Sequence, residues 1–199
     1  MHHYSQLKQD IFAFDTAISK TYIEIGASHP VKINNTYLLE QSNWKGFSIE
    51  LDTSKKDHWD SSDRNNKIYW DDAITFDYLQ ALEENNLPNH IGYLSCDIEP
   101  PINTFAALQK VIAQGVTFDC ITFEHDKYQS DIDYDPIVKE YLQNNGYKVA
   151  VDNVFRMRKY RVESNKPKIN KTCYMETWFV NESIYTKTLD YIDWKKLYD

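Results

Sequence analysis

The segment that most restricts the fold is residues 21–30, TYIEIGASHP, in which a short strand rich in β-branched residues runs into a turn of small residues beginning at Gly26. A buried strand that ends in such a turn, just before a helix, leaves backbone N–H groups facing outward and lets a ligand approach the main chain closely. Nucleotide-like ligands are usually held in this way. We therefore expect an α/β fold whose ligand site lies at this turn.

Two acids indicate which ligand this turn favours. Glu24 stands two residues before Gly26, where its negative charge repels a pyrophosphate and attracts an ammonium group. S-adenosylmethionine carries an α-amino group and a sulfonium centre, and it has no phosphate. Glu50 ends the next expected strand, where its carboxylate can accept both hydroxyls of a ribose, as the corresponding acid of dinucleotide folds does. The pair therefore predicts S-adenosylmethionine as the cofactor.

The net charge and the cysteines indicate which binding partners and which cellular compartment to expect. The net charge of −8 makes broad nucleic-acid binding unfavourable, because neutralising phosphates needs a basic face. A local basic cluster at 156–161 is interpreted as a solvated loop or edge strand. Three widely spaced cysteines predict buried free thiols in a reducing compartment. With neither a signal-like start nor a long apolar run, we expect a soluble cytoplasmic protein with no membrane partner, in the host cytoplasm if the source is viral.

Hydrophobic periodicity predicts one domain over 1–199, with strands alternating with helices. The N-terminal helix falls within 1–20, and a polar loop at 156–171 is expected before the last strand. This alternation indicates a mostly parallel sheet with a late antiparallel hairpin and helices on both faces. Expected strands are 21–25, 47–51, 67–70, 91–96, 118–123, 147–155 and 174–180, and expected helices are 5–18, 37–40, 76–87, 103–114, with Asn103 as its cap, and 135–142.

Acidic residues follow the strands with a regularity that bears on function. In an open α/β sheet the carboxyl ends of the strands form the edge that binds ligands. Five expected strands end in or next to an acid, which places these carboxylates at one edge. The acids are Glu24, Glu50, Asp72, Asp97 and Glu124.

The order of motifs resembles the FkbM-like branch of S-adenosylmethionine-dependent methyltransferases over most of the chain. The acid-x-Trp-aromatic-Val ending at 176–180 is similar to a phage-associated subgroup, which implies a viral or phage origin. The resemblance implies a Rossmann-like class I methyltransferase fold with seven strands, and methyl transfer to an oxygen, commonly of a sugar or polyketide. The matching pieces are 5–10, 22–27, 35–40, 44–50, 93–99, 121–126 and 176–180.

The resemblance also implies roles for individual residues. Glu24, Gly26 and Ala27 would line the methionine end of the cofactor, with Ser28 and Asn35 beside them. Glu50 would hold the ribose, and Asp72 with Ala73 would face the adenine. Asp97 and Glu99 would lie under the methyl group. The sequence departs from the family at 28–30 and at 100–101, where SHP and PP replace more usual small or polar residues.

Methyl transfer to an alcohol needs an aligned acceptor and a base that removes the hydroxyl proton. His125 is a candidate base because its ordinary pKa lies near neutrality, and Asp97 or Glu124 could orient it or replace it. The alternative is a surface histidine just beyond a strand. Asp97, Glu99, Glu124, His125 and Asp126 could instead hold Mg²⁺ or another hard divalent ion, mainly through carboxylate oxygens.

Two further functions stay open at this point. The sequence EPPI at 99–102 is superficially similar to the motif of nucleic-acid amino methyltransferases, but Ile102 stands where those enzymes stack an aromatic ring on a flipped base. The chain could also be a non-catalytic module that binds the cofactor or a partner. The expected acceptor is a small molecule or glycan; its identity and the oligomeric state are left open.

Overall fold

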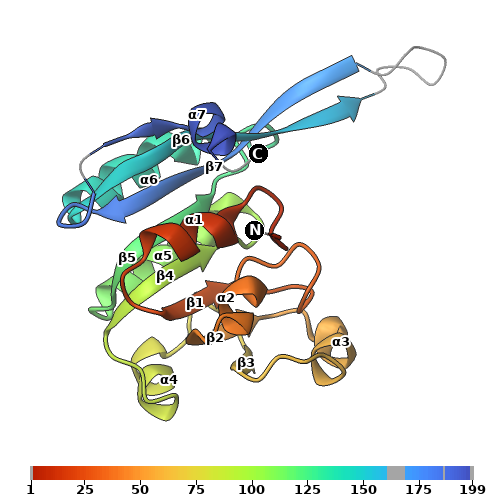
Figure 1. Cartoon of the computed structure of the whole chain (residues 1–199), viewed down its shortest axis with the longest axis vertical. Coiled ribbons are helices and arrows are strands. Elements are labelled where there is room, and N and C mark those ends of the chain that lie inside the picture. The colour runs from red at the N-terminus through yellow and green to blue at the C-terminus, as the bar shows by residue number, and fades with distance from the viewer. Residues whose placement is uncertain (1, 161–168, 186, 198–199) are drawn as a thin grey trace.

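The computed structural model describes residues 2–160, 169–185 and 187–197, and in this part of the chain the strands form one eight-stranded sheet flanked by helices (Figure 1). The strands are β1 (Thr21–Ile25), β2 (Lys45–Glu50), β3 (Lys67–Trp70), β4 (His90–Cys96), β5 (Thr117–Glu124), β6 (Tyr147–Tyr160), β7 (Ile169–Asn181) and β8 (Leu189–Asp190). The helices are α1 (Gln9–Thr16), α2 (Tyr37–Gln41), α3 (Lys56–Asp60), α4 (Tyr78–Glu84), α5 (Pro101–Ala113), α6 (Tyr134–Asn144) and α7 (Tyr191–Lys196), and a short 3₁₀ turn, η1 (Thr53–Lys55), precedes α3.

The sheet order is β3-β2-β1-β4-β5-β7-β6-β8. Strands β1 to β5 pair in parallel, and β7 runs antiparallel to both β5 and β6, which confirms the mostly parallel sheet and its late hairpin. The order reverses between β1 and β4, so the loops after these two strands diverge and leave a crevice at their carboxyl ends. The expected count of seven strands is one too low, because the two residues of β8 pair with β6 at Val151 and Asp152.

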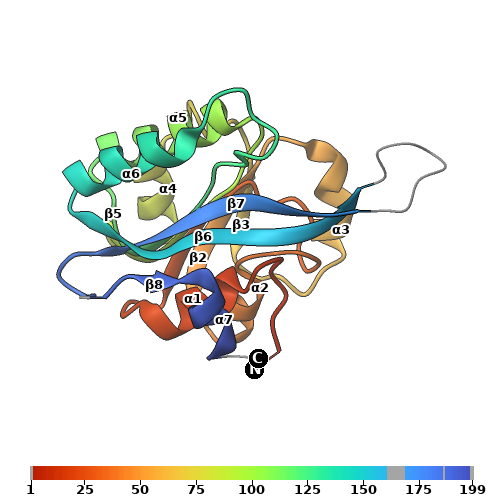
Figure 2. The same ribbon diagram turned by 90° about the horizontal axis from the view of Figure 1, so that it is seen from above.

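Helices cover both faces of the sheet, as expected (Figure 2). Helices α4, α5 and α6 pack on one face, where Leu82, Leu108 and Val138 are buried in one hydrophobic cluster. Helices α1, α2 and α7 pack on the other face, where Phe12, Trp178 and Trp194 belong to a second cluster. The cysteines Cys96, Cys120 and Cys173 are all buried and unbridged, which confirms the prediction of free thiols.

The region expected to be a polar loop at 156–171 is largely β-structure. Strands β6 and β7 continue as a two-stranded ribbon, with register pairs from Phe155 with Tyr174 to Tyr160 with Ile169, and the ribbon projects from the body in Figure 1. The expected loop is therefore wrong for 156–160 and 169–171, and for 156–160 the alternative of an edge strand is confirmed, while 161–168 lie outside the described residues. Because most of the described side chains at 156–159 and 170–172 are exposed, these strand segments need not alternate apolar and polar residues, and the sequence pattern that identifies buried strands is missing.

Two expected helix starts shift for local reasons. Helix α1 begins at Gln9 and not near Ser5, because the Asp10 carboxylate accepts the backbone N–H of Tyr4 at 2.7 Å and of Ser5 at 3.2 Å and folds that segment into turns. Helix α5 begins at Pro101, two residues before the expected cap, since proline is well suited to the first helical position. No helix in the described part of the chain has the length and apolar character needed to span a membrane.

Candidate active site

The turn after β1 is packed tightly against the loop after β4. The Gly26 N–H donates to the Ile49 carbonyl at 3.0 Å, and Gly26 has a φ of +84°. A Cβ at this position would lie 1.7 Å from the carbonyl oxygen of Asp97. Only glycine satisfies both the left-handed backbone and this contact, so Gly26 sets the distance between the β1 and β4 loops at the crevice.

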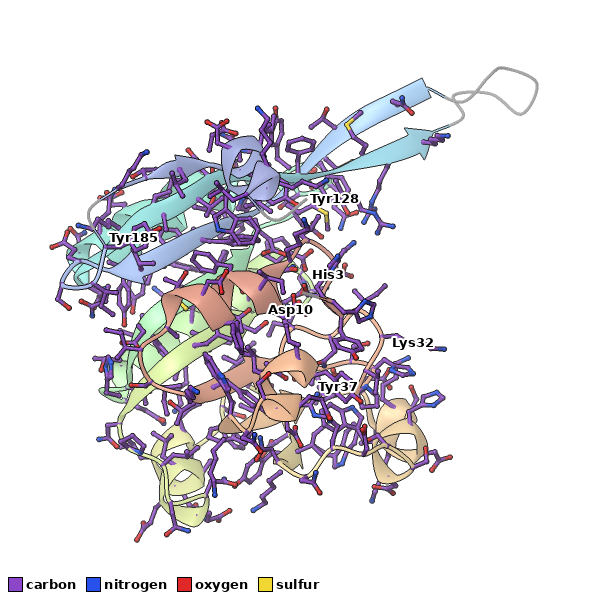
Figure 3. All side chains as sticks on the ribbon, in the orientation of Figure 1. His3, Asp10, Lys32, Tyr37, Tyr128 and Tyr185 are labelled. Carbon is purple, nitrogen blue, oxygen red and sulfur yellow. The ribbon has the colours of Figure 1, made fainter. Side chains whose placement is uncertain are left out.

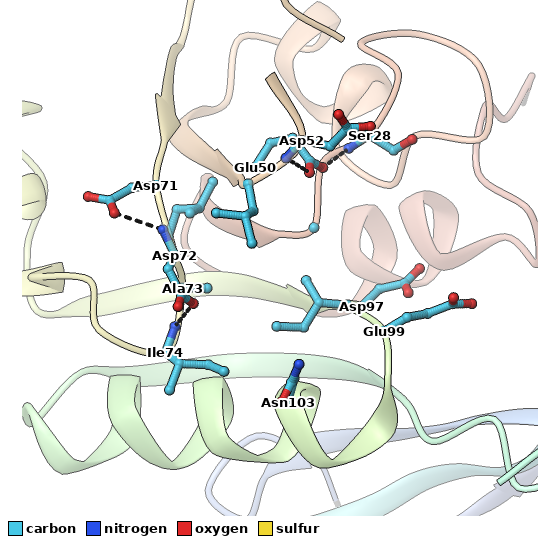
Figure 4. Close-up of a pocket in the computed structure, with 14 residues that line it drawn as sticks. Ser28, Glu50, Asp52, Asp71, Asp72, Ala73, Ile74, Asp97, Glu99 and Asn103 are labelled. Carbon is cyan, nitrogen blue, oxygen red and sulfur yellow. Dashed lines mark hydrogen bonds between the residues drawn. The ribbon is translucent and has the colours of Figure 1, made fainter. Parts of the chain in front are cut away.

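The first cavity lies over the ends of β1, β2 and β3 and has a volume of about 580 Å³ (Figure 4). This volume is typical of small-molecule sites. Its wall contains six acids and, among the residues lining it, no lysine, arginine or histidine. A dinucleotide would place two phosphates in this negative field, so the electrostatics favour a ligand without phosphate. The acids are Glu50, Asp52, Asp71, Asp72, Asp97 and Glu99.

The Glu50 carboxylate is fixed by the backbone on both of its oxygens. The Ser28 N–H donates to Oε2 at 2.7 Å, and the Asp52 N–H donates to Oε1 at 2.7 Å (Figure 4). Each carboxylate oxygen can accept a further hydrogen bond. Glu50 is thereby oriented at the cavity wall with spare acceptor capacity for a diol.

The turn after β3 forms another part of this wall. Asp72 Oδ1 accepts the backbone N–H of Ile74 at 2.9 Å, and the Ala73 carbonyl accepts the Tyr78 hydroxyl at 2.9 Å. Both contacts hold the turn in one conformation. Asp72 and Ala73 therefore present a fixed edge to the cavity, opposite Asn103 of α5 in Figure 4.

A second cavity, of about 440 Å³, adjoins the first. Gly26, Ser28, Asp97 and Glu99 line both. Lys32 and Tyr128, which are labelled in Figure 3, line the second cavity on other loops. The structure thus brings all nine residues predicted for cofactor binding to the walls of these two cavities: Glu24, Gly26, Ala27, Ser28, Asn35, Glu50, Asp72, Ala73 and Asp97.

Glu24 is almost completely buried in β1 and is held by hydroxyl groups. Its Oε2 accepts the Ser48 hydroxyl at 2.7 Å and the Thr36 hydroxyl at 2.9 Å. Burial raises the pKa of this carboxyl, and the nearby Arg64 guanidinium opposes that shift. Asn35 reaches the same region, where its Nδ2 donates to Ser95 Oγ at 2.9 Å. These contacts fix the floor of the second cavity.

Arg64 organises the loop around this floor, a role that the sequence pattern does not indicate. Its side chain is buried and makes five hydrogen bonds, the full donor capacity of a guanidinium. The acceptors are Glu40 Oε2, the Pro30 carbonyl, Asn34 Oδ1, the Tyr22 hydroxyl and Thr36 Oγ1.

Trp59 of α3 secures the same loop from the other side. Its Nε1 donates to the Ser28 carbonyl at 2.9 Å, and its ring lies 4.7 Å from the Arg64 guanidinium. The segment 52–66, whose polar sequence predicts a loop with a short helix, therefore holds the loop after β1. The pattern gives no signal for this role, because every partner is distant along the chain.

Buried carboxyl groups gather at the ends of β4 and β5. Burial raises the pKa of Asp97, and burial with the neighbouring Asp97 raises that of Glu124 well above its usual range. In β7, burial raises the pKa of Glu176 to about 8. Gln9 Nε2 and Trp178 Nε1 donate to this carboxyl and favour its ionised form.

In Asp126, only one of the two carboxylate oxygens has a hydrogen-bond partner among the described residues. Gln129 Nε2 donates to its Oδ2 at 2.6 Å, whereas Oδ1 is buried and has no hydrogen-bond partner among the described residues. Burial and the neighbouring Asp97 raise the pKa of Asp126 to about 6. Asp126 lines the second cavity, so a ligand with a hydroxyl or amine donor could supply the missing partner.

His125 points away from this cluster. Its side chain is 1% exposed, does not line the cavities described here, and has Nε2 3.5 Å from Thr177 Oγ1 and 3.8 Å from Asp135 Oδ1. Burial lowers its pKa to about 4, although Asp135 opposes the shift. This placement fits neither a catalytic base nor the alternative of a surface histidine. We interpret His125 as a neutral packing residue between β5, β7 and α6.

The possible metal ligands Asp97, Glu99, Glu124, His125 and Asp126 do not form a metal centre. Within the described residues, no group of three or more histidine, cysteine or acidic side chains is arranged to hold a metal ion. His125 is turned toward Asp135 and Thr177, while the acidic members of the set line the second cavity. We therefore assign no step to a metal.

Comparison with solved structures identifies the fold. TrmK of M. capricolum in complex with S-adenosyl-homocysteine aligns with a TM-score of 0.56 at 10% identity, covering 94% of this chain and 73% of that chain. Sp1610 of Streptococcus pneumoniae in complex with S-adenosyl-L-methionine aligns with a TM-score of 0.53 at 7% identity, covering 92% of this chain and 76% of that chain. Precorrin-6y C5,15-methyltransferase of Geobacter metallireducens GS-15 aligns with a TM-score of 0.51 at 11% identity, covering 86% of this chain and 88% of that chain. The chain has the Rossmann-like fold of S-adenosylmethionine-dependent methyltransferases.

Comparisons at the level of sequence add no family. No family model matches the chain, and no curated protein matches it. The similarity to FkbM-like enzymes and to a phage-associated subgroup therefore rests on the motifs alone.

Proposed function

We propose that this protein is an S-adenosylmethionine-dependent methyltransferase that acts on a hydroxyl group of a small molecule or glycan. The observation that carries the proposal is the Glu50 carboxylate, held by the Ser28 and Asp52 amides at the wall of a cavity without cationic residues. This arrangement suits a ribose diol and disfavours phosphates. The fold and the position of Glu50 at the end of β2 support the same ligand.

The residues of the site fit the cofactor. Glu50 would hold the ribose hydroxyls, and the turn of Asp72 and Ala73 would face the adenine. The second cavity, with Glu24 and Asn35 in its wall, would take the methionine end. When bound, the cofactor supplies a methyl group that its sulfonium centre activates toward displacement. Because that activation lies in the cofactor, the protein has to align the acceptor and remove its proton.

Asp126 is the base that the geometry supports. An acceptor hydroxyl donating to Oδ1 would satisfy the buried oxygen and place its proton on a group whose pKa is about 6. A base with a pKa near the working pH is the most effective. Asp126 would take the hydroxyl proton as the acceptor oxygen receives the methyl group that the bound cofactor would supply, with the carbon–sulfur electron pair left on the cofactor's sulfur. Asp97 and Glu124, which line the same cavity, would position the acceptor beside it.

The test is transfer of a labelled methyl group from S-adenosylmethionine to a panel of neutral glycosides and phenols, with tRNA and a phosphorylated sugar included. We expect incorporation into neutral hydroxyl compounds by the wild-type protein and loss of incorporation in Asp126→Asn. Incorporation into tRNA alone would contradict the proposed acceptor. No incorporation in any of them, with intact cofactor binding, would favour a non-catalytic module.

A further inference from the structure

A third hollow lies beside the site, between the start of α5 and the loop that joins β5 to α6. Its volume is about 590 Å³. Pro100, Pro101 and Ile102 line it on one side, and Ile132 lines it on the loop. None of the nine residues predicted for cofactor binding lines this hollow, so it is a separate space from the two cavities described above.

The hollow adjoins the proposed site of methyl transfer. Glu99 lines this hollow and both other cavities. Gln129 also lines the hollow, and its Nε2 donates at 2.6 Å to Asp126, which lines the second cavity. A ligand that contacts Gln129 in the hollow would therefore be one hydrogen-bonded side chain away from Asp126, whose Oδ1 has no partner among the described residues.

Exposed apolar side chains form part of the surface of the hollow. Ile102 and Ile132 are each 54% exposed, and both line this one hollow together with two prolines. Exposure of isoleucine side chains to water is unfavourable, and covering them with an apolar surface lowers the free energy. Gln129 and Ser130 add hydrogen-bonding groups at the same wall.

The charges of the hollow restrict its ligand further. Glu99 and Asp131 are acidic, and no lysine, arginine or histidine is among the residues that line it. A phosphate or carboxylate would meet negative charge without a compensating cation. A neutral ligand can cover the isoleucines and use the polar groups without this penalty.

We infer that this hollow binds the methyl acceptor, and that the acceptor is an uncharged ring compound with one apolar face and hydroxyl groups, such as an unphosphorylated glycoside. The inference rests on the proposed function, since it places the acceptor hydroxyl beside Asp126. Ile102 and Ile132 contact the apolar face, and Gln129 and Ser130 contact the hydroxyls.

The test uses protein labelled at the isoleucine δ1 methyl groups and phenyl β-D-glucopyranoside as the probe, with S-adenosylhomocysteine present and absent. Signals are assigned with Ile102→Val and Ile132→Val. We expect saturable shifts of both methyl signals and none at Ile192, a comparably exposed isoleucine on α7. Glucose 6-phosphate should shift neither, and the variant with Ile102→Ser and Ile132→Ser should bind the glucoside at least about tenfold more weakly.

The outcomes separate the two proposals. Shifts that spread to Ile192, glucoside binding unchanged in the double variant, or preferred binding of glucose 6-phosphate would each overturn the inference. Absence of any glucoside binding while S-adenosylhomocysteine binds would overturn the inference and leave the cofactor assignment standing. Failure of S-adenosylhomocysteine to bind, with the glucoside still bound in the hollow, would remove the proposed function and keep the hollow as a ligand site.

Discussion

The guanidinium of Arg64 and the carboxylate of Glu40 form an ion pair with a 2.5 Å separation between Nε and Oε2, and their side chains are only 1% and 6% exposed. The same arginine binds the Pro30 carbonyl and Asn34 in the loop after β1. An ion pair at the end of α2 thus fixes the backbone that forms the floor of the candidate site. Its contribution is the position of the loop, because a buried pair does not guarantee a gain in stability over apolar packing.

We expect Arg64→Lys to lower the free energy of unfolding by about 2 to 3 kcal/mol, because an ammonium cannot replace five directed donors and leaves buried acceptors unsatisfied. Chemical denaturation measures this change. Arg156→Lys, at an exposed position of the projecting ribbon, is the control and should change stability by less than about 0.5 kcal/mol. Equal effects of the two substitutions would contradict the role assigned to Arg64.

A comparison of the melting temperatures of Gly26→Ala and Gly115→Ala distinguishes the effect of a steric contact from that of backbone strain. Both glycines have a φ above +80°, so each alanine has a similar backbone cost of about 1 kcal/mol. The Cβ at 115 would meet nothing within 4 Å, whereas the Cβ at 26 would lie 1.7 Å from the Asp97 carbonyl. We expect Gly26→Ala to have the clearly lower melting temperature. Equal melting temperatures would show that the two loops separate easily.

His125 should make the stability depend on pH. Burial lowers its pKa to about 4 in the folded protein, while an unfolded histidine titrates near about 6.5. Between these values the unfolded chain binds a proton that the folded chain does not, so stability falls as pH falls, by at most about 1.4 kcal/mol per pH unit. The loss begins below about 6.5 and is complete below about 4.

His125→Gln should remove this component of the pH dependence, which is read as the difference in unfolding free energy between variant and wild type across the window. Using the difference cancels the opposite contributions of Asp126 and Glu176, whose pKa values are raised. His58→Gln, at an exposed position, serves as the control. A difference that stays constant between pH 4 and 6.5 would mean that folded His125 accepts a proton freely.

Asp126 should control the pH dependence of catalysis. Its pKa is about 6, so the ionised, proton-accepting form predominates above that pH and is lost below it. We expect kcat/KM to rise up to tenfold per pH unit below about 6 and to level off above it. Asp126→Asn should lower kcat by roughly 10²- to 10⁴-fold and abolish this limb. A variant with an unchanged rate and pH profile would exclude Asp126 as the base.

The alternation of buried strands and helices was sufficient to predict the central fold. Strand 67–70 matches β3, and the acids expected at the strand ends do line the cavities. This worked because parallel strands bury both faces and their carboxyl ends meet at one edge. The first residues of β7, 169–173, and the two residues of β8 escaped prediction because neither has the continuous apolar run of a buried strand.

The details of the site depended on contacts that sequence spacing does not encode. His125 has the residue type of a base, but its backbone directs it toward Asp135 and Thr177. Asp126, the next residue, adopts a left-handed φ of +43° and lines the cavity. Arg64 joins residues from 22 to 40 in one network. The opposite side-chain directions of two neighbouring residues and a long-range hydrogen-bond network can be seen only in the folded structure, so the sequence does not predict them.

The most direct test of the account is calorimetric titration of the folded protein with S-adenosylhomocysteine, compared with Glu50→Ala and with Glu83→Ala at an exposed position on α4. We predict saturable binding to wild type and to Glu83→Ala. Binding to Glu50→Ala should be weaker by about 30-fold, since hydrogen bonds to a charged group contribute about 2 kcal/mol. No binding to the folded wild-type protein, or equal affinity of Glu50→Ala, would contradict the assignment of this cavity to the cofactor.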